Sequence, residues 1–160
     1  MNTSFQKGQG ILDLSPIGCI FFKIQITDGF LTRLFLSKRP LKTKSRLKIA
    51  HLSSSLKKCL LNNSLTNFPL PIFICGTVFE RKVWSECMKI PCGTTITYGE
   101  LAKRISCKSP RAVGQALKRN PLPIIIPCHR VLGKGEKLTG FSCGIEIKRM
   151  LIEFERLGAT

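Results

Sequence analysis

The fold is decided by residues 97–121, which read TYGELAKRISCKSPRAVGQALKRNP. Thr97 and Glu100 have the spacing of a capping box, in which the threonine oxygen accepts from a backbone amide and the glutamate reaches back to the cap. Ser109-Pro110 marks a second helix start, because proline at the first helical position loses no hydrogen bond. The stretch therefore predicts two short helices joined by a short turn, which is the outline of a helix-turn-helix.

Basic side chains dominate this predicted helix pair, with Glu100 as the single acidic residue among them. The basic residues are Lys103, Arg104, Lys108, Arg111, Lys118 and Arg119. Each phosphate that they neutralise would release counterions, so contact with a nucleic-acid backbone is one prediction. Many helical domains contain such an outline without binding nucleic acid, and on these residues alone both interpretations stay open.

The whole chain is as unbalanced in charge as this stretch. Its 160 residues include 26 Lys and Arg but only 9 Asp and Glu, which gives a formal net charge of +17. Such a charge favours polyanionic partners, with nucleic acid as the main prediction and an anionic membrane surface as the alternative. A basic surface without a specific partner also remains open. No segment has the roughly 18 apolar residues that a membrane span requires.

Far before residues 97–121, the N-terminal part of the chain has the alternating pattern of strands. Residues 19–26 and 30–36 alternate around a turn at Thr27-Asp28-Gly29 and predict a hairpin. Residues 47–61 have apolar side chains at helical spacing, and residues 62–71 contain three Asn, two Pro and two Ser or Thr, as in a linker. The basic segment 38–48 is predicted to be a solvated loop, with a phosphate-contacting patch as the alternative.

The C-terminal part is predicted to be mainly helical. A further capping box at Thr77 and Glu80 opens one helix, and another helix follows Gly144. We therefore expect an α/β protein with two domains, residues 1–70 and residues 71–160. Glu155 lies near the end of the last helix, where an acidic residue opposes the helix dipole; this placement suggests a functional role, although an exposed glutamate is the simpler interpretation.

A candidate reactive group lies in residues 124–131, which read IIIPCHRV. Here Cys128 and His129 are adjacent at the end of what we expect to be an apolar strand. A thiol attacks as the thiolate, so a nucleophilic cysteine needs a base or a positive charge nearby, and His129 and Arg130 offer both. A buried, inert cysteine with a chance histidine neighbour is the alternative for the dipeptide alone.

The remaining cysteines give no metal or disulfide pattern. None of the eight forms a Cys-x-x-Cys pair, and the only histidines are His51 and His129, so structural zinc is not expected. No secretory signal is recognised, so we expect a cytoplasmic protein with reduced cysteines. We expect no cofactor.

Motifs along the second half resemble those of the O6-alkylguanine-DNA alkyltransferases. The similarity is continuous from about residue 76 to residue 155, and residues 18–36 agree more loosely with the family's ribonuclease-H-like N-terminal domain. The motifs are Gly76-Thr77 with Phe79 and Val83-Trp84, Ile90-Pro91 with Gly93, Thr97-Tyr98-Gly99 with Leu101-Ala102, Arg111-Ala112-Val113-Gly114, Asn120-Pro121, Pro127 to Val131, Leu138-Thr139-Gly140-Phe141, and Lys148.

The resemblance implies repair of DNA by a protein that acts once. An alkyl group on guanine O6, or less readily on thymine O4, would pass irreversibly to Cys128. His129 would remove the thiol proton through a water, Glu155 would hold His129, and Tyr98 would protonate the departing guanine. The partner would be double-stranded DNA bound by a monomer, without a membrane or an obligate protein partner.

The resemblance also implies how the damaged base is reached. The nucleotide must leave the duplex, at a cost of a few kcal/mol. Arg111 would fill the vacated stack, Asn120 would be a hinge, and Pro123, Val131 and Phe141-Ser142 would be pocket walls. The DNA-binding residues would be Lys108, Arg111, Ala112, Gly114 and Lys118, approaching the minor groove.

Four features depart from the family pattern. The connection between Leu101 and Arg111 is one residue shorter, which affects the placement of Arg111. Phe141 replaces a frequent tyrosine. Cys143 replaces a glycine and is expected to narrow the pocket toward bulky alkyl groups. The zinc ligands of some relatives are not recognisable.

Two other functions remain to be separated from the alkyltransferase. An alkyltransferase-like protein binds lesions without reacting, but such proteins lack the acceptor cysteine, so Cys128 argues against this class. A helix-turn-helix regulator would require neither the motif at residues 127–131 nor Glu155.

Overall fold

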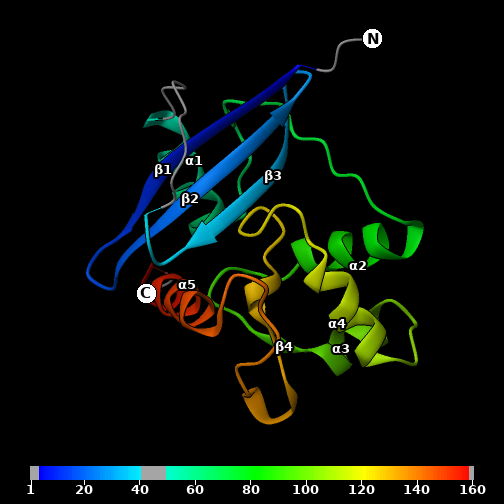
Figure 1. The fold of residues 1–160 in the computed structure, drawn as a ribbon. Coiled ribbons are helices and arrows are strands. Elements are labelled where there is room, and N and C mark those ends of the chain that lie inside the picture. Colours follow the sequence, from blue (N-terminus) through cyan, green and yellow to red (C-terminus); the bar gives the residue numbers. More distant parts are fainter. Residues whose placement is uncertain (1–3, 41–49, 159–160) are drawn as a thin grey trace.

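The computed structural model describes residues 4–40 and 50–158. It combines a small antiparallel sheet with several helices, which confirms the α/β class (Figure 1). The sheet and helix α1 come from the first part of the chain, and the other helices come from the second (Figure 1). No helix in the described ranges is long and apolar enough to cross a membrane.

The sheet has three strands in the order β1-β2-β3. Their bounds are Phe5–Leu14 for β1, Gly18–Thr27 for β2 and Phe30–Ser37 for β3. The predicted hairpin is confirmed as β2 and β3. Asp28 and Gly29 connect these strands with positive φ angles of 52° and 83°, as a tight hairpin turn requires.

Strand β1 was not predicted, because residues 5–10 contain two glycines and several polar residues. It pairs with β2 over its whole length, and Gly10 lies opposite Phe22. A Cβ atom at position 10 would lie 2.6 Å from the Phe22 ring, so glycine leaves room for that buried side chain. The glycine that obscured the strand is therefore what allows it to pair.

Helix α1 covers Ala50–Asn62 and packs against β1 with buried Leu52, Leu56 and Leu60. The helix predicted over residues 47–61 is confirmed for its described part. Most of the basic segment 38–48 lies outside the described residues. After α1, the predicted linker follows the sheet edge, where the Leu31 N–H donates to the Pro71 carbonyl at 2.8 Å.

Three helices then begin where their capping residues predict. Helix α2 covers Val78–Met88, α3 covers Tyr98–Arg104 and α4 covers Pro110–Lys118. Both capping boxes form, with Thr77 and Thr97 accepting from the amides of Glu80 and Glu100 at 3.2 and 3.1 Å. Val83 and Trp84 of α2 are buried, whereas the side chain of Phe79 is 37% exposed. It lies in the first turn of α2, next to the exposed Val78.

The last elements bring together segments that are far apart in the second half of the chain. Strand β4, Ile96–Thr97, pairs in parallel with β5, Val131–Leu132. The short 3-10 turns η1, Cys128–Arg130, and η2, Lys134–Glu136, flank β5. Helix α5 covers Ile145–Gly158 and packs against η1 and α1. Residues of η1 and α5 thereby meet in the interior.

Candidate active site

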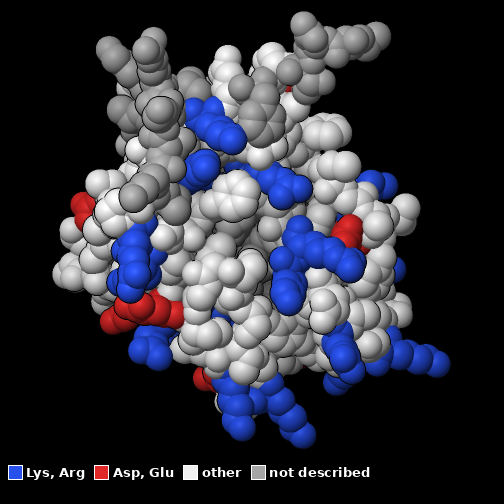
Figure 2. All heavy atoms as spheres, in the orientation of Figure 1, with Lys and Arg blue, Asp and Glu red and all other residues white. Residues whose placement is uncertain are grey.

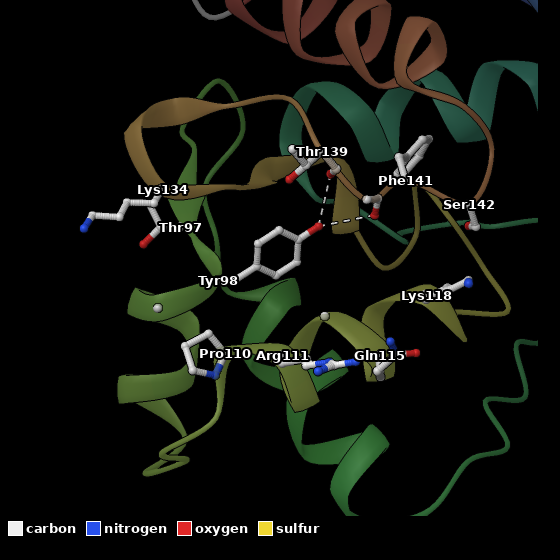
Figure 3. A pocket seen from close by; sticks show the side chains of 13 residues that line it. Thr97, Tyr98, Pro110, Arg111, Gln115, Lys118, Lys134, Thr139, Phe141 and Ser142 are labelled. Carbon is white, nitrogen blue, oxygen red and sulfur yellow. Dashed lines mark hydrogen bonds between the residues drawn. The ribbon is translucent and has the colours of Figure 1, made fainter.

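A pocket of about 690 Å³ opens between helix α4 and the loop that follows η2. Figure 3 shows the Tyr98 side chain between α4, which carries Arg111 and Gln115, and the loop, which carries Thr139 and Phe141. The lining residues are Thr97, Tyr98, Gly99, Pro110, Arg111, Gly114, Gln115, Lys118, Lys134, Thr139, Gly140, Phe141 and Ser142. The pocket therefore joins the two predicted helices to a loop far along the chain.

Tyr98 is held at this pocket by the loop backbone. Its hydroxyl donates to the carbonyls of Thr139 at 3.2 Å and Gly140 at 3.3 Å (Figure 3). Gly140 has a φ of +63°, and a Cβ atom there would lie 3.0 Å from the hydroxyl. Burial raises the pKa of Tyr98 to about 12, so the phenol keeps its proton at neutral pH.

Cys128 lies behind the pocket and is not one of its lining residues. The expected strand at residues 124–128 is wrong: Pro123 and Pro127 remove backbone donors, Ile124 has a φ of +79°, and Cys128 begins η1. In a 3-10 helix successive side chains point about 120° apart, whereas in a strand they point to opposite faces. Cys128 and His129 therefore do not point to opposite faces, as they would on a strand.

The thiol of Cys128 is buried and held by one amide. Asn120 Nδ2 donates to Cys128 Sγ at 2.9 Å and to the Ile126 carbonyl at 2.8 Å. Burial raises the pKa of Cys128 to about 12, although the hydrogen bond from Asn120 acts in the opposite direction. The resting group is therefore a protonated thiol that needs a base in order to attack.

His129, Glu155 and Arg130 form a buried network next to this thiol. His129 Nε2 lies 2.6 Å from Glu155 Oε1, and Arg130 Nε lies 2.9 Å from Glu155 Oε2. Burial raises the pKa of Glu155, but the hydrogen bonds and charges of His129 and Arg130 outweigh it and lower the pKa. Because a carboxylate only accepts, His129 carries its proton on Nε2.

The other ring nitrogen of His129 is available as a base. Nδ1 is buried and has no hydrogen-bond partner among the described residues. Burial lowers the pKa of His129, so the imidazole is neutral at pH 7. A neutral imidazole with a lone pair on Nδ1, beside a protonated thiol, is the chemistry of an activated cysteine.

Arg130 differs from its expected position beside the thiol. Its guanidinium is fully buried against Glu155 and also donates to the Leu60 carbonyl at 3.1 Å and to the side chain of Asn63. It therefore links the end of helix α1 to the network.

Lys148 is a buried cation that the sequence reasoning noted only as part of a motif. Its Nζ donates to the carbonyls of Val131 at 2.6 Å and Thr139 at 2.8 Å, and lies 5.7 Å from the centre of the Tyr98 ring. Burial lowers its pKa to about 8, while Cys128 acts to raise it. Its helical spacing from Leu151 and Glu155 on α5 was the one signal in the sequence that could have indicated its inward position.

The predicted DNA-binding residues fall into two groups. Arg111, Gly114 and Lys118 line the pocket, whereas Lys108 and Ala112 do not. Lys108 is exposed just before α4 and Ala112 is half-buried.

The predicted pocket walls also divide. Phe141 and Ser142 line the pocket, whereas Pro123 and Val131 do not. Cys143 was expected to narrow this pocket but lines a neighbouring hollow with Pro123 instead. Among the described residues no group of three or more His, Cys, Asp or Glu could hold a metal ion.

Comparison with known proteins connects this geometry to one family. Residues 78–157 match the family model described as 6-O-methylguanine DNA methyltransferase, DNA binding domain. The methylated-DNA–protein-cysteine methyltransferase of Methanosarcina mazei is 46% identical over 103 residues, which cover 64% of this chain and 65% of that protein. The constitutive enzyme of Bacillus subtilis is 39% identical over 155 residues, covering 89% and 92%.

Solved structures agree with these sequence matches. The crystal structure of Mycobacterium tuberculosis OGT in complex with DNA has a TM-score of 0.67 and 36% identity, and 94% of each chain is covered. The match covers less than two thirds of the Methanosarcina mazei protein but nearly all of the Bacillus subtilis and mycobacterial chains. The family model covers half of the chain, and the Bacillus subtilis enzyme is similar over nearly its whole length. On these grounds the chain belongs to the 6-O-methylguanine DNA methyltransferase family.

Proposed function

We propose that the protein repairs DNA by moving the alkyl group of O6-alkylguanine, or less readily of O4-alkylthymine, onto its own Cys128. The observation that carries the proposal is the buried thiol next to a histidine whose Nδ1 has no partner and whose Nε2 is held by an ionised carboxylate. The relatives named methylated-DNA–protein-cysteine methyltransferase support this choice of reaction.

The chemical step replaces a thiol hydrogen with an alkyl group. A water between Cys128 Sγ and His129 Nδ1 would pass the thiol proton to the imidazole, and Glu155 would stabilise the imidazolium. As the Sγ–carbon bond forms, the carbon–O6 bond breaks and its electron pair stays on the guanine. Tyr98 would give a proton to the guanine and recover one from the imidazolium through solvent. The thioether is stable, so each molecule would react once.

Base flipping would bring the damaged base to this site. We propose that α3 and α4 act as a helix-turn-helix at the minor groove, with Arg111 occupying the space that the flipped nucleotide leaves. Lys108, Ala112 and Lys118 would contact the backbone. Gly114 lies next to Tyr98, since a Cβ atom at position 114 would be 3.7 Å from the Tyr98 ring. The absence of a side chain there would allow the DNA strand to approach.

The finer description of the chain follows the same family pattern. We propose that residues 1–70 form a ribonuclease-H-like domain with a linker and that residues 71–160 form the catalytic DNA-binding domain. A monomer and a cytoplasmic location stay predictions from the sequence.

The test is to weigh the intact protein after incubation with duplex DNA that carries O6-methylguanine. We expect a gain of one methyl group on Cys128, no gain in Cys128→Ala, and full gain in Cys19→Ala, which removes an exposed thiol on β2. Tight lesion binding without any gain in mass would contradict the proposal and favour an alkyltransferase-like protein.

A further inference from the structure

A second hollow of about 600 Å³ lies beside the pocket that Tyr98 and Arg111 line, between strand β3 and the C-terminal end of helix α4. We call it the β3–α4 groove. Its walls include Arg33 and Phe35 from β3, and Lys118 and Arg119 from the end of α4. Figure 2 shows basic side chains across the middle of the face that carries these elements, with few acidic side chains among them.

The charge of the groove suits a phosphate. Arg33 and Lys118 are exposed, and Arg119 is 70% exposed although it donates to Glu80 at 3.1 Å. Glu80 is buried, and its ion pair with Arg119 holds the Arg119 guanidinium at the edge of the groove. Three cations and one carboxylate line the groove among the described residues, so its net charge is positive.

The groove also offers an aromatic surface. Along β3 the side chains of Leu34 and Leu36 are buried, while Arg33 and Phe35 point outward from the same face of the strand. Phe35 is 42% exposed. Exposed aromatic rings beside cations are the surface that unpaired nucleotides use, because a base stacks on the ring while its phosphate meets the charge.

The groove and the pocket beside Tyr98 are neighbours. Lys118 and Ser142 line both hollows. Asn120, which lines the groove, also donates to Cys128 Sγ at 2.9 Å, so one side chain connects the groove wall to the reactive thiol. The Leu34 N–H donates to the Pro121 carbonyl at 2.9 Å. This hydrogen bond connects β3 to the segment that follows α4 and holds the two walls of the groove together.

We infer that the β3–α4 groove binds an unpaired nucleotide of the DNA adjacent to the flipped base, with the phosphate on Arg33 and Lys118 and the base on Phe35. This inference rests on the proposed repair function and extends the DNA contact to the sheet. The nucleotide has two possible sources, the damaged strand beside the lesion and the complementary strand that loses its partner. Both supply the same chemistry.

Affinity for duplex DNA carrying O6-methylguanine tests the contact. We expect Phe35→Ala to weaken binding about tenfold, through loss of one stacked base. Arg33→Ala is expected to reduce the slope of log affinity against log salt by about one, through loss of one phosphate contact. The matched controls are Phe30→Ala, a residue on the same strand that is 43% exposed, and Arg149→Ala, an exposed arginine on α5; both should leave affinity within about twofold.

A fluorescent base identifies the source without relying on any variant. 2-Aminopurine is placed at successive positions beside the lesion and, in separate duplexes, opposite it. Position-specific quenching on the damaged strand assigns that strand, and quenching on the complement assigns the other. No position-specific quenching, together with variants that bind like their controls, would overturn the inference.

Methyl transfer separates this result from the proposed function. At saturating DNA, Phe35→Ala and Arg33→Ala should methylate Cys128 at the wild-type rate, because neither side chain belongs to the relay. If Cys128 never gains a methyl group while the groove variants still weaken binding, the repair reaction fails and the groove stands. If transfer proceeds while the groove variants match their controls, the groove fails alone.

Discussion

Among the described residues, the sheet and helix α1 bury no charged side chain, whereas the region from residue 76 onward buries six polar or charged side chains, four of which are at most 1% exposed. These four are His129, Arg130, Lys148 and Glu155. Taking a charge out of water costs several kcal/mol and is offset only when partners are well placed. Stability alone would be served as well by an apolar core, so we infer that the second region retains these groups for chemistry.

The largest effect is expected when His129, the proposed proton acceptor, is removed. His129→Ala should slow methyl transfer by about 10²- to 10⁴-fold, because it removes the proton acceptor and leaves the basic helices in place. Single-turnover transfer from DNA with a labelled methyl group measures the rate, and fluorescence anisotropy measures affinity. Equal losses in rate and affinity would contradict the role of His129.

The second expected effect concerns stability. Arg130→Ala should lower the free energy of unfolding by about 3–5 kcal/mol, because Glu155 is then a buried charge without its main partner. Chemical denaturation measures this change.

The double variant Arg130→Met with Glu155→Leu sharpens the comparison between the regions. It should recover much of the lost stability, since no unpaired charge remains, but it should not recover methyl transfer. Recovery of transfer in this variant would show that the network is only structural.

The third prediction concerns pH. Burial lowers the pKa of His129 from its ordinary value of 6.5, so the neutral base form still predominates at pH 6.5. The transfer rate should be flat from pH 8 to pH 6.5 and should fall only at lower pH, approaching tenfold per unit below the pKa of His129. Glu155 acts to raise that pKa, so Glu155→Gln should slow transfer and move the acid limb to lower pH. An acid limb centred above pH 6.5 would contradict this account.

The smallest effect is expected in the sheet. Ile24→Val removes one methylene from a fully buried side chain and should cost about 0.5–1.5 kcal/mol of stability. The rate of methyl transfer to Cys128 should not change, as measured in the same single-turnover assay. A changed rate would show that packing in the sheet reaches the relay.

Local patterns predicted the parts of the fold that depend on neighbouring residues. Capping boxes located the starts of α2 and α3, and alternation located the hairpin, since both signals act within a few residues. Strand β1 was missed because its evidence lies in another strand: Gly10 makes sense only opposite Phe22. The run at residues 124–128 was predicted to be a strand because of its isoleucines, although Pro123 and Pro127 cannot donate to a ladder.

The members of the candidate site were predictable, and so was the contact between His129 and Glu155, but its other connections were not. Resemblance to the family named Cys128, His129, Glu155 and Tyr98. It did not indicate that Arg130 contacts Glu155 and the Leu60 carbonyl, which are 25 and 70 residues away. Such contacts depend on tertiary packing, and nothing in the spacing of the residues encodes them.

The contact between Arg130 and the end of α1 also matters for engineering. The Arg130 guanidinium donates to the Leu60 carbonyl in the last turn of α1 and holds the carboxylate of Glu155, so it links the first region directly to the relay. Exchange of the first 70 residues with those of a relative should preserve reactivity only if the incoming helix presents a carbonyl at that point. This contact is therefore one that a chimera must reproduce in order to keep the relay in place.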